Sequence, residues 1–356
     1  MGILIIAFHP RFMTPYITPY ETAIKKRGIP YDVLFWDRFH DRPLEKKGNE
    51  YIFHCTCTLG GKRYKKFYPF YLFRQAAISV LAQRRYDKII VLNTMPGFLL
   101  HDILLRTYSG RYIFDIRDYT YERYSFYRKI VQKLIANSCF TALSSRAFAT
   151  FLGFSDKYVY VHNVSNIGRR TERPSLTAAK AKVTVGFVGV VRYPRENEML
   201  IKKLSGSKRY ILKYVGITYP DCRLRDFCAK HYGDCTIFRD KFDNEDKPVI
   251  YETIDFINNI YGDSRLEVTT AVSNRFYDGL IFKKPILASK HTYVGDLVET
   301  YHLGISVDVV HDDVYSLVEA YIRDFDGPVF AESADRVLQQ VVTEQNYFCR
   351  RLEQFI

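Results

Sequence analysis

The sequence predicts an α/β protein with two Rossmann-like domains in tandem, facing each other across a cleft. Short apolar runs recur between helix-length segments, which is the pattern of strands in a parallel, doubly wound sheet. The chain has 356 residues, more than one hydrophobic core usually serves. A polar and basic stretch at residues 166–182 divides the alternation into two halves, as an interdomain linker does.

The first half, residues 1–165, is predicted to be the N-terminal Rossmann-like domain. Its apolar runs are short and bounded by segments with helical spacing. The expected strands are Ile3–Phe8, Tyr31–Trp36, Lys88–Leu92, Arg111–Asp115, Phe140–Ser144 and Tyr158–His162. The expected helices are Tyr16–Arg27, Pro69–Arg85, Phe98–Thr107, Tyr121–Asn137 and Arg146–Leu152.

The alternation restarts after the linker, so residues 183–330 are predicted to form a second Rossmann-like domain. The segment at residues 331–356 has apolar residues at helical spacing and no strand after it, which predicts a C-terminal helix. The expected strands of the second domain are Val183–Val191, Tyr210–Val215, Thr236–Phe238, Ile254–Ile257, Pro285–Ala288 and Ile305–Val307.

The composition of the chain favours some classes of binding partner over others. The net charge is +13, with 29 Tyr and 26 Phe, which suits an anionic small substrate or an anionic bilayer surface. The basic residues are dispersed and form no recognisable nucleic-acid motif, so nucleic acid is not expected. The seven cysteines are scattered without metal-ligand spacing, which predicts a reducing compartment and no metal site. No stretch approaches the length of a membrane span.

The stretch from Ser273 to Ser289, SNRFYDGLIFKKPILAS, is the most informative motif. It joins a polar helix start to an apolar helix, a Lys-Lys-Pro break and a short buried strand. Backbone N–H groups at a helix N-terminus bind phosphate. We therefore expect Asn274 and Arg275 to hold a diphosphate and Asp278 to reach sugar hydroxyls.

A second candidate site follows the first strand of the second domain. The strand runs into Gly189, and Arg192 and Arg195 come directly after it. A glycine lets the backbone approach a diphosphate, and arginine neutralises its charge. The glycine spacing is not that of the dinucleotide fingerprint. A pair of solvated surface arginines is the alternative interpretation.

The remaining candidates also follow predicted strands, where open parallel sheets bind their ligands. His9 and Arg11 follow the first strand and could meet an acceptor or a phosphate. Asp115, Arg117 and Asp118 combine two carboxylates with a guanidinium, so that Arg117 could orient Asp118. A structural salt bridge explains this cluster about as well. Phe242 could stack on a nucleobase or fill the core.

One aromatic and basic segment suggests contact with a membrane. Residues 62–74, KRYKKFYPFYLFR, are the densest cluster of this kind in the chain. Tyr and Phe at headgroup depth and Lys against anionic lipid would form an interfacial patch. A helix start with solvated lysines is the alternative. The expected localisation is cytoplasmic, with peripheral attachment to the inner face of the cell membrane left open.

These motifs together resemble GT-B glycosyltransferases. In that family an Asn-Lys-Leu/Phe-Tyr/Phe-Glu motif runs into Gly-Lys-Pro-Val-Ile-Ala, and Asp278 stands in the place of the Glu. Enzymes of bacterial polysaccharide synthesis similar to glycosyltransferase family 4 carry Asp-x-Arg-Asp-Leu-Trp-Pro, of which this chain keeps Asp115, Arg117 and Asp118. The first loop lacks the usual Gly-Gly of the family.

The resemblance implies a metal-independent hexosyltransferase that moves a sugar from a nucleotide-sugar donor to a saccharide acceptor. UDP is the commonest donor nucleotide of the family, and the acceptor is expected to be lipid-linked, in capsule or exopolysaccharide synthesis. Catalytic candidates are Asp118, His9 and Arg117. The donor-binding candidates are Gly189, Arg192, Arg195, Phe242, Asn274, Arg275 and Asp278.

The nucleotide sugar is a substrate in this interpretation, so no cofactor is expected. The resemblance also implies that the C-terminal helix crosses back onto the first domain. Two other functions stay open. One is a nucleotide-sugar epimerase of the same architecture, which would need no acceptor. The other is a non-catalytic GT-B partner of an active glycosyltransferase.

Overall fold

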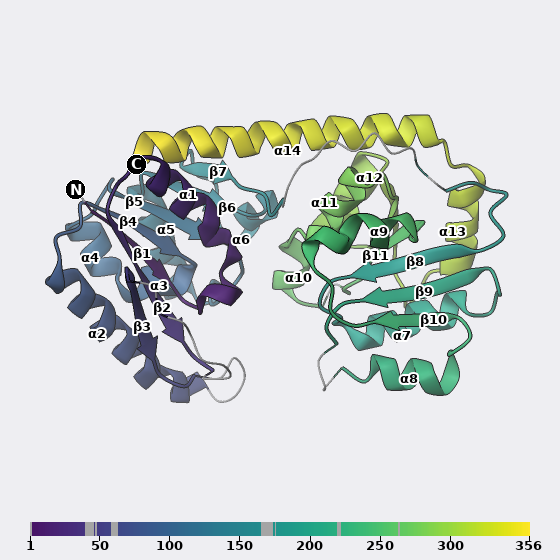
Figure 1. Cartoon of the computed structure of the whole chain (residues 1–356), viewed down its shortest axis with the longest axis horizontal. Coiled ribbons are helices and arrows are strands. Elements are labelled where there is room, and N and C mark those ends of the chain that lie inside the picture. Colours follow the sequence, from purple (N-terminus) through teal and green to yellow (C-terminus); the bar gives the residue numbers. More distant parts are fainter. Residues whose placement is uncertain are drawn as a thin grey trace. The chain divides into compact units, whose positions relative to one another are not determined.

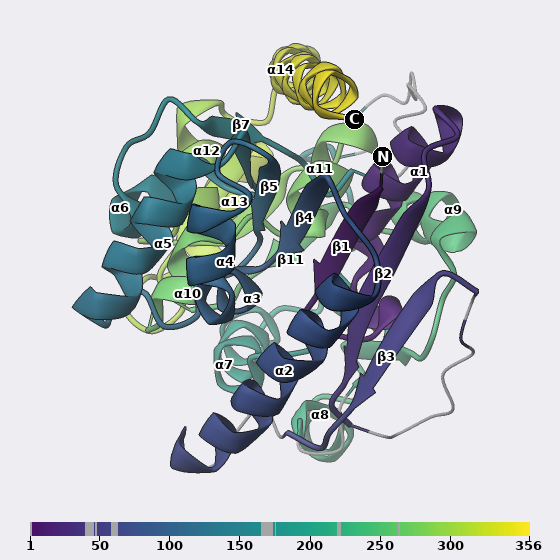
Figure 2. The same cartoon turned by 90° about the vertical axis from the view of Figure 1, so that its left-hand side faces the viewer.

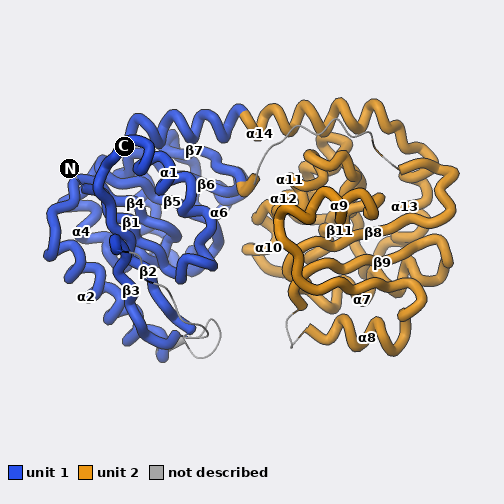
Figure 3. The backbone as a smooth tube through the Cα atoms, viewed as in Figure 1, with its two compact units in different colours: residues 1–162, 343–356 blue, residues 163–342 orange. Residues whose placement is uncertain are grey.

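The protein consists of two compact units, shown in Figure 3. Unit 1 comprises Met1–His162 and Thr343–Ile356, and unit 2 comprises Asn163–Val342. Each unit contains one parallel sheet with helices on both faces (Figure 1). The computed structural model describes residues 2–39, 46, 48–57, 63–164, 174, 176–218, 222–262 and 264–356. Most of the predicted linker, at 166–173 and 175, lies outside the described residues.

The sheet of unit 1 has seven strands in the order β3-β2-β1-β4-β5-β6-β7. All neighbouring strands are parallel. Several of the strands can be followed in Figure 2. Their bounds are β1 (Ile3–Ala7), β2 (Tyr31–Asp37), β3 (Glu50–His54), β4 (Lys88–Leu92), β5 (Tyr112–Ile116), β6 (Phe140–Leu143) and β7 (Tyr158–Tyr160).

The alternation of side chains in β1 explains why this strand is central. Ile3 and Ile5 contribute to the core on one face of the sheet, and Leu4 and Ile6 to the core on the other. Successive residues of a strand point to opposite faces, so a continuous apolar run predicts a strand covered on both sides. The edge strand β3 was not predicted, because it is partly exposed and carries no such run.

The helices of unit 1 divide between the two faces of its sheet. Helices α2 to α5 cover one face, and α1 covers part of the other. The helix expected at 98–107 is two helices, because Leu100 leaves the helical conformation (φ −110°, ψ 15°). The bounds are α1 (Thr18–Lys26), α2 (Phe67–Gln83), α3 (Thr94–Leu99), α4 (His101–Arg106), α5 (Ser125–Asn137) and α6 (Ala149–Leu152).

Unit 2 has a parallel sheet of six strands in the order β10-β9-β8-β11-β12-β13. Every strand predicted for this half is present within a few residues of its expected bounds. These are β8 (Val183–Val188), β9 (Tyr210–Val215), β10 (Thr236–Arg239), β11 (Phe256–Asn259), β12 (Ile286–Ser289) and β13 (Gly304–Val307). The two sheets confirm the prediction of two Rossmann-like domains.

The helices of unit 2 also form two layers. Helices α7, α8 and α13 pack on one face, and α9, α11, α12 and the first half of α14 pack on the other. The bounds are α7 (Pro194–Leu204), α8 (Leu224–His231), α9 (Lys247–Glu252), α10 (Leu266–Thr270), α11 (Asn274–Ile281), α12 (Tyr293–Thr300), α13 (Val314–Arg323) and α14 (Gly327–Phe355).

The last turns of α14 complete the core of unit 1. Phe348, Leu352 and Phe355 are buried on the face that α1 also covers. The ring of Phe348 packs edge-on against Tyr20, with 5.6 Å between centroids. Nε2 of His162 lies 2.8 Å from a carboxylate oxygen of Glu344, which adds a polar contact beside this apolar one. No helix among the described residues is long and apolar enough to cross a membrane.

Candidate functional site

The start of α11 lies beside the carboxyl end of β11 in unit 2. Ser273 is the N-cap, because its hydroxyl accepts a hydrogen bond from the backbone N–H of Phe276 at 3.3 Å. The same hydroxyl donates to Oδ1 of Asn259 at 2.6 Å. Asn274 is the first residue of the helix and is exposed. The helix therefore begins where the sequence predicted, with its first N–H groups beside the end of the sheet.

Arg275 is a buried cation in the first turn of α11. Only 4% of its surface is exposed, and its guanidinium carbon lies 3.4 Å from the ring centroid of Phe187 and 4.6 Å from that of Tyr261. Its Nη1 is buried and has no hydrogen-bond partner in the described part of the chain. A buried donor without a partner is costly, so Arg275 is unusual among the buried cations of unit 2.

The loops after three neighbouring strands are tied together around Arg275. The backbone N–H groups of Tyr261 and Gly262 donate to the hydroxyl of Ser289, at 3.0 Å and 3.1 Å. The ring of Tyr193 packs edge-on against Tyr261, with 4.9 Å between centroids. Because these loops follow β8, β11 and β12, the site lies at the edge where parallel sheets bind ligands.

The loop after β8 is held by Asn197, which is fully buried in α7. Its Nδ2 donates to the carbonyl oxygens of Arg192 and Tyr193, at 3.3 Å and 3.0 Å. Its Oδ1 accepts from Tyr214 at 3.1 Å and from Nδ2 of Asn258 at 2.8 Å. Sequence reasoning missed this role, since an asparagine at a helix start is more often a solvated turn residue.

Gly189 and two arginines complete this loop. Gly189 has φ of +132°, a conformation that side chains strongly disfavour. A side chain on Gly216, at the end of the neighbouring β9, would lie 2.0 Å from the carbonyl oxygen of Gly189, so the two strand ends approach closely. Arg192 and Arg195 are exposed, Arg192 on the loop and Arg195 in the first turn of α7.

Asp278 is bound by two side chains from α9. Lys247 donates to both of its carboxylate oxygens at 3.0 Å, and the hydroxyl of Tyr251 donates to Oδ2 at 2.8 Å. Burial and the Asp278 charge hold the pKa of Tyr251 well above its ordinary value. The sequence offered no signal for Lys247, which lies 31 positions away. Phe242 is half-buried and packs against the core that includes Tyr251.

In unit 1, His9 follows β1 as predicted. Burial, and then the charge of Arg38, lower its pKa to about 4. The imidazole is therefore neutral at pH 7. Its Nδ1 is buried and has no hydrogen-bond partner among the residues that the structure describes.

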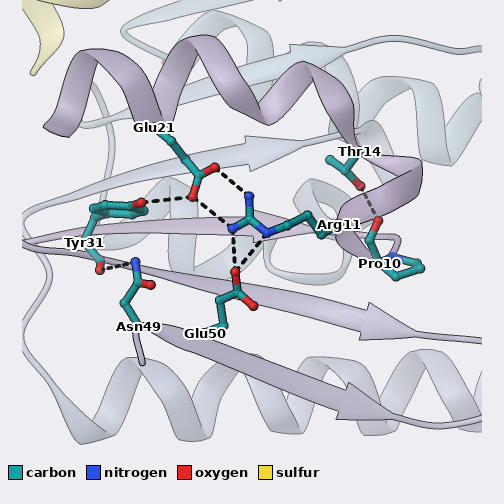
Figure 4. Close-up of polar contacts among 7 residues, drawn as sticks. All are labelled: Pro10, Arg11, Thr14, Glu21, Tyr31, Asn49 and Glu50. Atoms are coloured by element: carbon teal, nitrogen blue, oxygen red, sulfur yellow. Dashed lines mark hydrogen bonds and ion pairs between the residues drawn. The ribbon is translucent and has the colours of Figure 1, made fainter. Parts of the chain in front are cut away.

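Arg11, the other candidate of this loop, belongs to an ion-pair network, drawn in Figure 4. Nη1 lies 2.7 Å from Glu21 and Nη2 lies 2.6 Å from Glu50. Tyr31 donates a further hydrogen bond to Glu21 at 3.0 Å. Two carboxylates compensate this guanidinium, so Arg11 joins α1 to β3 rather than presenting an unpaired charge to a ligand.

Arg117 is buried and paired with Asp115. Its Nε and Nη2 lie 2.5 Å and 2.8 Å from the two carboxylate oxygens. The hydroxyl of Tyr20 also donates to Asp115 at 2.7 Å, and the ring of Tyr16 lies against the guanidinium at 4.9 Å. Asp118 is exposed, directly after this cluster. Arg117 is therefore paired with Asp115, and Asp118 is the carboxylate of this cluster that reaches solvent.

Glu122, four residues beyond Asp118, was not among the predicted residues. It is fully buried, and its Oε2 accepts the backbone N–H of Thr120 at 2.5 Å. Burial raises the pKa of its carboxyl. Its other oxygen is unpartnered within the described ranges. A lone glutamate between a turn and a helix reads as solvated in sequence, so nothing in the pattern pointed to a buried acid.

The described residues contain no group of three or more His, Cys, Asp and Glu that could hold a metal ion. Unit 2 brings together a buried guanidinium whose Nη1 has no hydrogen-bond partner among the described residues, a helix N-terminus and two exposed arginines, at one edge of a parallel sheet. Groups of this kind are able to bind an anion. The arrangement in unit 1 combines a neutral histidine and an exposed carboxylate at the corresponding edge of its own sheet.

Comparisons with known proteins agree with this architecture. No protein-family model matches the chain, and no curated protein matches it. Among solved structures, HepE from Anabaena in complex with UDP and glucose is similar, with a TM-score of 0.69 and 14% identity over 99% of this chain and 100% of that one.

Two further structures are similar over almost the whole chain. Sucrose-phosphate synthase from Thermosynechococcus elongatus has a TM-score of 0.65 and 13% identity, over 100% of this chain and 94% of that one. WaaG, a glycosyltransferase involved in lipopolysaccharide biosynthesis, has a TM-score of 0.61 and 10% identity, over 100% and 99%. The chain therefore has the fold of the GT-B glycosyltransferases.

Proposed function

We propose that the protein is a glycosyltransferase that moves a sugar from a nucleotide-sugar donor, a UDP-sugar in the first instance, to a saccharide acceptor. The observation that carries the proposal is Arg275 at the start of α11, which is buried and whose Nη1 has no hydrogen-bond partner among the described residues. The complex of the similar HepE contains UDP and glucose, and that likeness supports a nucleotide-sugar donor here.

In this proposal the donor diphosphate is stabilised by unit 2. Arg275, the exposed Arg192 and Arg195, and the N–H groups at the start of α11 together oppose the negative charge that grows on the leaving diphosphate. These groups are held before the donor arrives, because Asn197 and Ser289 fix the loops. Positive side chains rather than a metal ion carry this charge in the proposed mechanism. Asp278 then accepts hydrogen bonds from sugar hydroxyls of the donor through carboxylate oxygens that Lys247 and Tyr251 already orient.

Unit 1 is proposed to bind the acceptor. If the reaction inverts the anomeric centre, Asp118 or His9 accepts the proton of the acceptor hydroxyl. A pKa of about 4 leaves His9 neutral at pH 7 but makes it a weak base. If the reaction retains configuration, the resemblance to family 4 implies departure and attack on one face without a protein base. Arg117, paired with Asp115, would act by holding the loop of Asp118.

We also propose that the acceptor is lipid-linked and that the enzyme works at a membrane surface in bacterial polysaccharide synthesis. Helix α2 begins with Phe67, Tyr68 and Tyr71, which are 71%, 68% and 56% exposed. Exposed aromatic side chains beside a basic segment suit the headgroup layer of an anionic bilayer. Of the basic segment itself, Lys62 and the side chains of Arg63 and Tyr64 lie outside the described residues. The similar WaaG acts in lipopolysaccharide biosynthesis.

The donor site is tested by thermal stabilisation of the full chain with UDP, GDP, CMP and TDP. We expect one nucleotide to raise the melting temperature, since a ligand at a hundred times its Kd stabilises by about 2.7 kcal/mol. Arg275→Met should abolish the shift, whereas Arg323→Met, an exposed arginine of the same unit, should keep it. A chain that no nucleotide stabilises would contradict the proposal.

The same preparation decides between the proposed activity and its rivals. Transfer to an acceptor should release the nucleoside diphosphate only when a saccharide acceptor is added. Turnover of a UDP-sugar without any acceptor would favour an epimerase instead. Nucleotide binding without turnover under any acceptor would favour a non-catalytic partner of another glycosyltransferase.

A further inference from the structure

Arg38, at the end of β2, is a buried cation with no carboxylate partner in the part of the chain that is described. Only 4% of its surface is exposed. Its guanidinium carbon lies 4.9 Å from the ring centroids of both Phe8 and Trp36. Its polar contact within the described residues is from Nη2 to the sulfur of Cys57 at 3.5 Å, and Nε has no partner there. Because a thiol is a weak acceptor, the described residues leave the charge of Arg38 almost uncompensated.

Two other arginines of unit 1 are paired with carboxylates. Arg11 is bound by Glu21 and Glu50, and Arg117 by Asp115. Asp37, adjacent to Arg38 in sequence, lies 3.0 Å from Nδ1 of His54. Arginine is almost never fully buried unless it is paired, because a lone buried charge is costly. An anion from outside the chain would supply the partner that Arg38 lacks among the described residues.

His9 adds a second unpartnered polar group beside Arg38. Both side chains lie near the ring of Phe8, with 5.6 Å between the ring centroids of Phe8 and His9 and 4.9 Å from the guanidinium carbon of Arg38 to the Phe8 centroid. Nδ1 of His9 is buried without a partner in the described ranges. The two residues follow β1 and β2, which pair in parallel, so both lie at the edge of the sheet where ligands bind.

We propose that Arg38 and His9 form a binding site for an oxyanion, and that the acceptor saccharide carries this group. The planar fork of arginine binds a phosphate or a carboxylate through two parallel hydrogen bonds, and a neutral imidazole still has one N–H to donate. The assignment to the acceptor rests on the proposed function, in which unit 1 holds the acceptor. The two sources of the anion are a phosphate of a lipid-linked saccharide and the carboxylate of an acidic sugar.

The test is thermal stabilisation of the full chain by inorganic phosphate and, separately, by glucuronate, with chloride keeping the ionic strength constant. We expect at least one anion to stabilise the wild type. Arg38→Met should weaken its binding about tenfold or more, since charge-assisted hydrogen bonds are worth at least that. Arg85→Met, at an exposed arginine of the same unit, should bind as the wild type does. A response to phosphate alone identifies a phosphorylated acceptor, and a response to glucuronate alone an acidic sugar.

The Arg275→Met variant separates this site from the donor site. We expect Arg275→Met to lose nucleotide binding and to keep the anion response. Arg38→Met should lose the anion response and keep nucleotide binding. Loss of the anion response in Arg275→Met but not in Arg38→Met would assign the anion to unit 2 and overturn the proposal, as would a wild type that neither anion stabilises. If UDP binds and no anion does, the donor assignment stands and this site fails. If the wild type responds to an anion through Arg38 and no nucleotide binds, this site stands and the donor assignment fails.

Two further readouts keep the proposal falsifiable if the Arg38→Met side chain disturbs folding. Without added anion, Arg38→Met should melt close to the wild type, because it removes an uncompensated buried charge. A large drop would assign Arg38 to the core and overturn the proposal. Arg38→Lys keeps the charge but loses the planar fork, so it should bind the anion less tightly than the wild type. Wild-type affinity in Arg38→Lys would also contradict a bidentate site.

Discussion

At the scale of single residues, the buried charges of the described chain differ in how completely they are paired. Asp278 is fully engaged by Lys247 and Tyr251, whereas Arg275 and Arg38 each have an unpartnered buried nitrogen in the described chain. A paired charge recovers part of the cost of its burial, and an unpaired one does not. In the proposed function we therefore expect the surroundings of these two arginines to change most when a ligand binds.

The pair of Lys247 and Asp278 gives a direct test at this scale. Lys247→Met should lower the free energy of unfolding by about 3 kcal/mol, because it leaves the buried carboxylate without its cation. The double variant Lys247→Met, Asp278→Asn should recover most of that loss. Urea unfolding monitored for unit 2 measures both, with Lys230→Met, at an exposed lysine of α8, as the control. Equal stability of Lys247→Met and Lys230→Met would show that Asp278 does not depend on Lys247.

At the scale of elements, α14 belongs to the cores of both units. Its first half carries Phe330, Val337 and Val341 in the core of unit 2, and its last turns carry Phe348 and Leu352 in the core of unit 1. The apolar residues recur at helical spacing along the whole element. Unit 1 is thus completed by the last residues of the chain, which cover a face of its sheet beside α1.

Neighbouring positions in α14 allow a matched comparison. Phe348→Ala should lower the free energy of unfolding of unit 1 by about 3–5 kcal/mol, because it opens a cavity in a packed core. Tyr347→Ala, at the adjacent exposed position, should cost about 0.5 kcal/mol or less. Thermal and urea unfolding of the full chain measure both. Similar losses for the two variants would mean that the end of α14 does not contribute to the core of unit 1.

At the scale of the whole molecule, charge and exposed aromatic surface act together. The net charge of +13 draws the protein toward any anionic surface, and salt weakens this attraction. Phe67, Tyr68 and Tyr71 add apolar area to one region, the start of α2. Electrostatic attraction alone does not distinguish one region of a basic protein from another, but burial of aromatic rings in the headgroup layer does.

Sedimentation with lipid vesicles tests the membrane proposal. The wild type should bind phosphatidylglycerol vesicles more tightly than phosphatidylcholine vesicles, and less tightly as salt rises. Replacing Phe67, Tyr68 and Tyr71 together by Ser should weaken binding by more than about tenfold, given roughly 1.5–3 kcal/mol for each buried aromatic side chain. Phe154→Ser, at a highly exposed phenylalanine of the same unit, is the control. An equal loss in the control would place the contact elsewhere.

The strands of both sheets and the start of α11 were predicted from the sequence. The exception is β3. Apolar runs, helical spacing and a serine N-cap are local properties, so they can be recognised in the sequence without knowledge of the fold. The exception has a physical cause, because β3 is an edge strand that is only partly buried. The division of the helix at 98–107 also escaped, since Leu100 carries no helix-breaking side chain.

The pairing of the charges was visible only in the tertiary structure. Arg11 meets Glu50 across 39 positions, and Lys247 meets Asp278 across 31, while Arg38 and Arg275 are buried without such a partner among the described residues. The sequence placed Arg11, Arg275 and Asp278 after strands or at a helix start, but it did not show which of these charges are paired. Burial and pairing arise when the ends of distant strands meet at one edge of a sheet, so only the folded chain shows which buried charges lack a partner among the described residues.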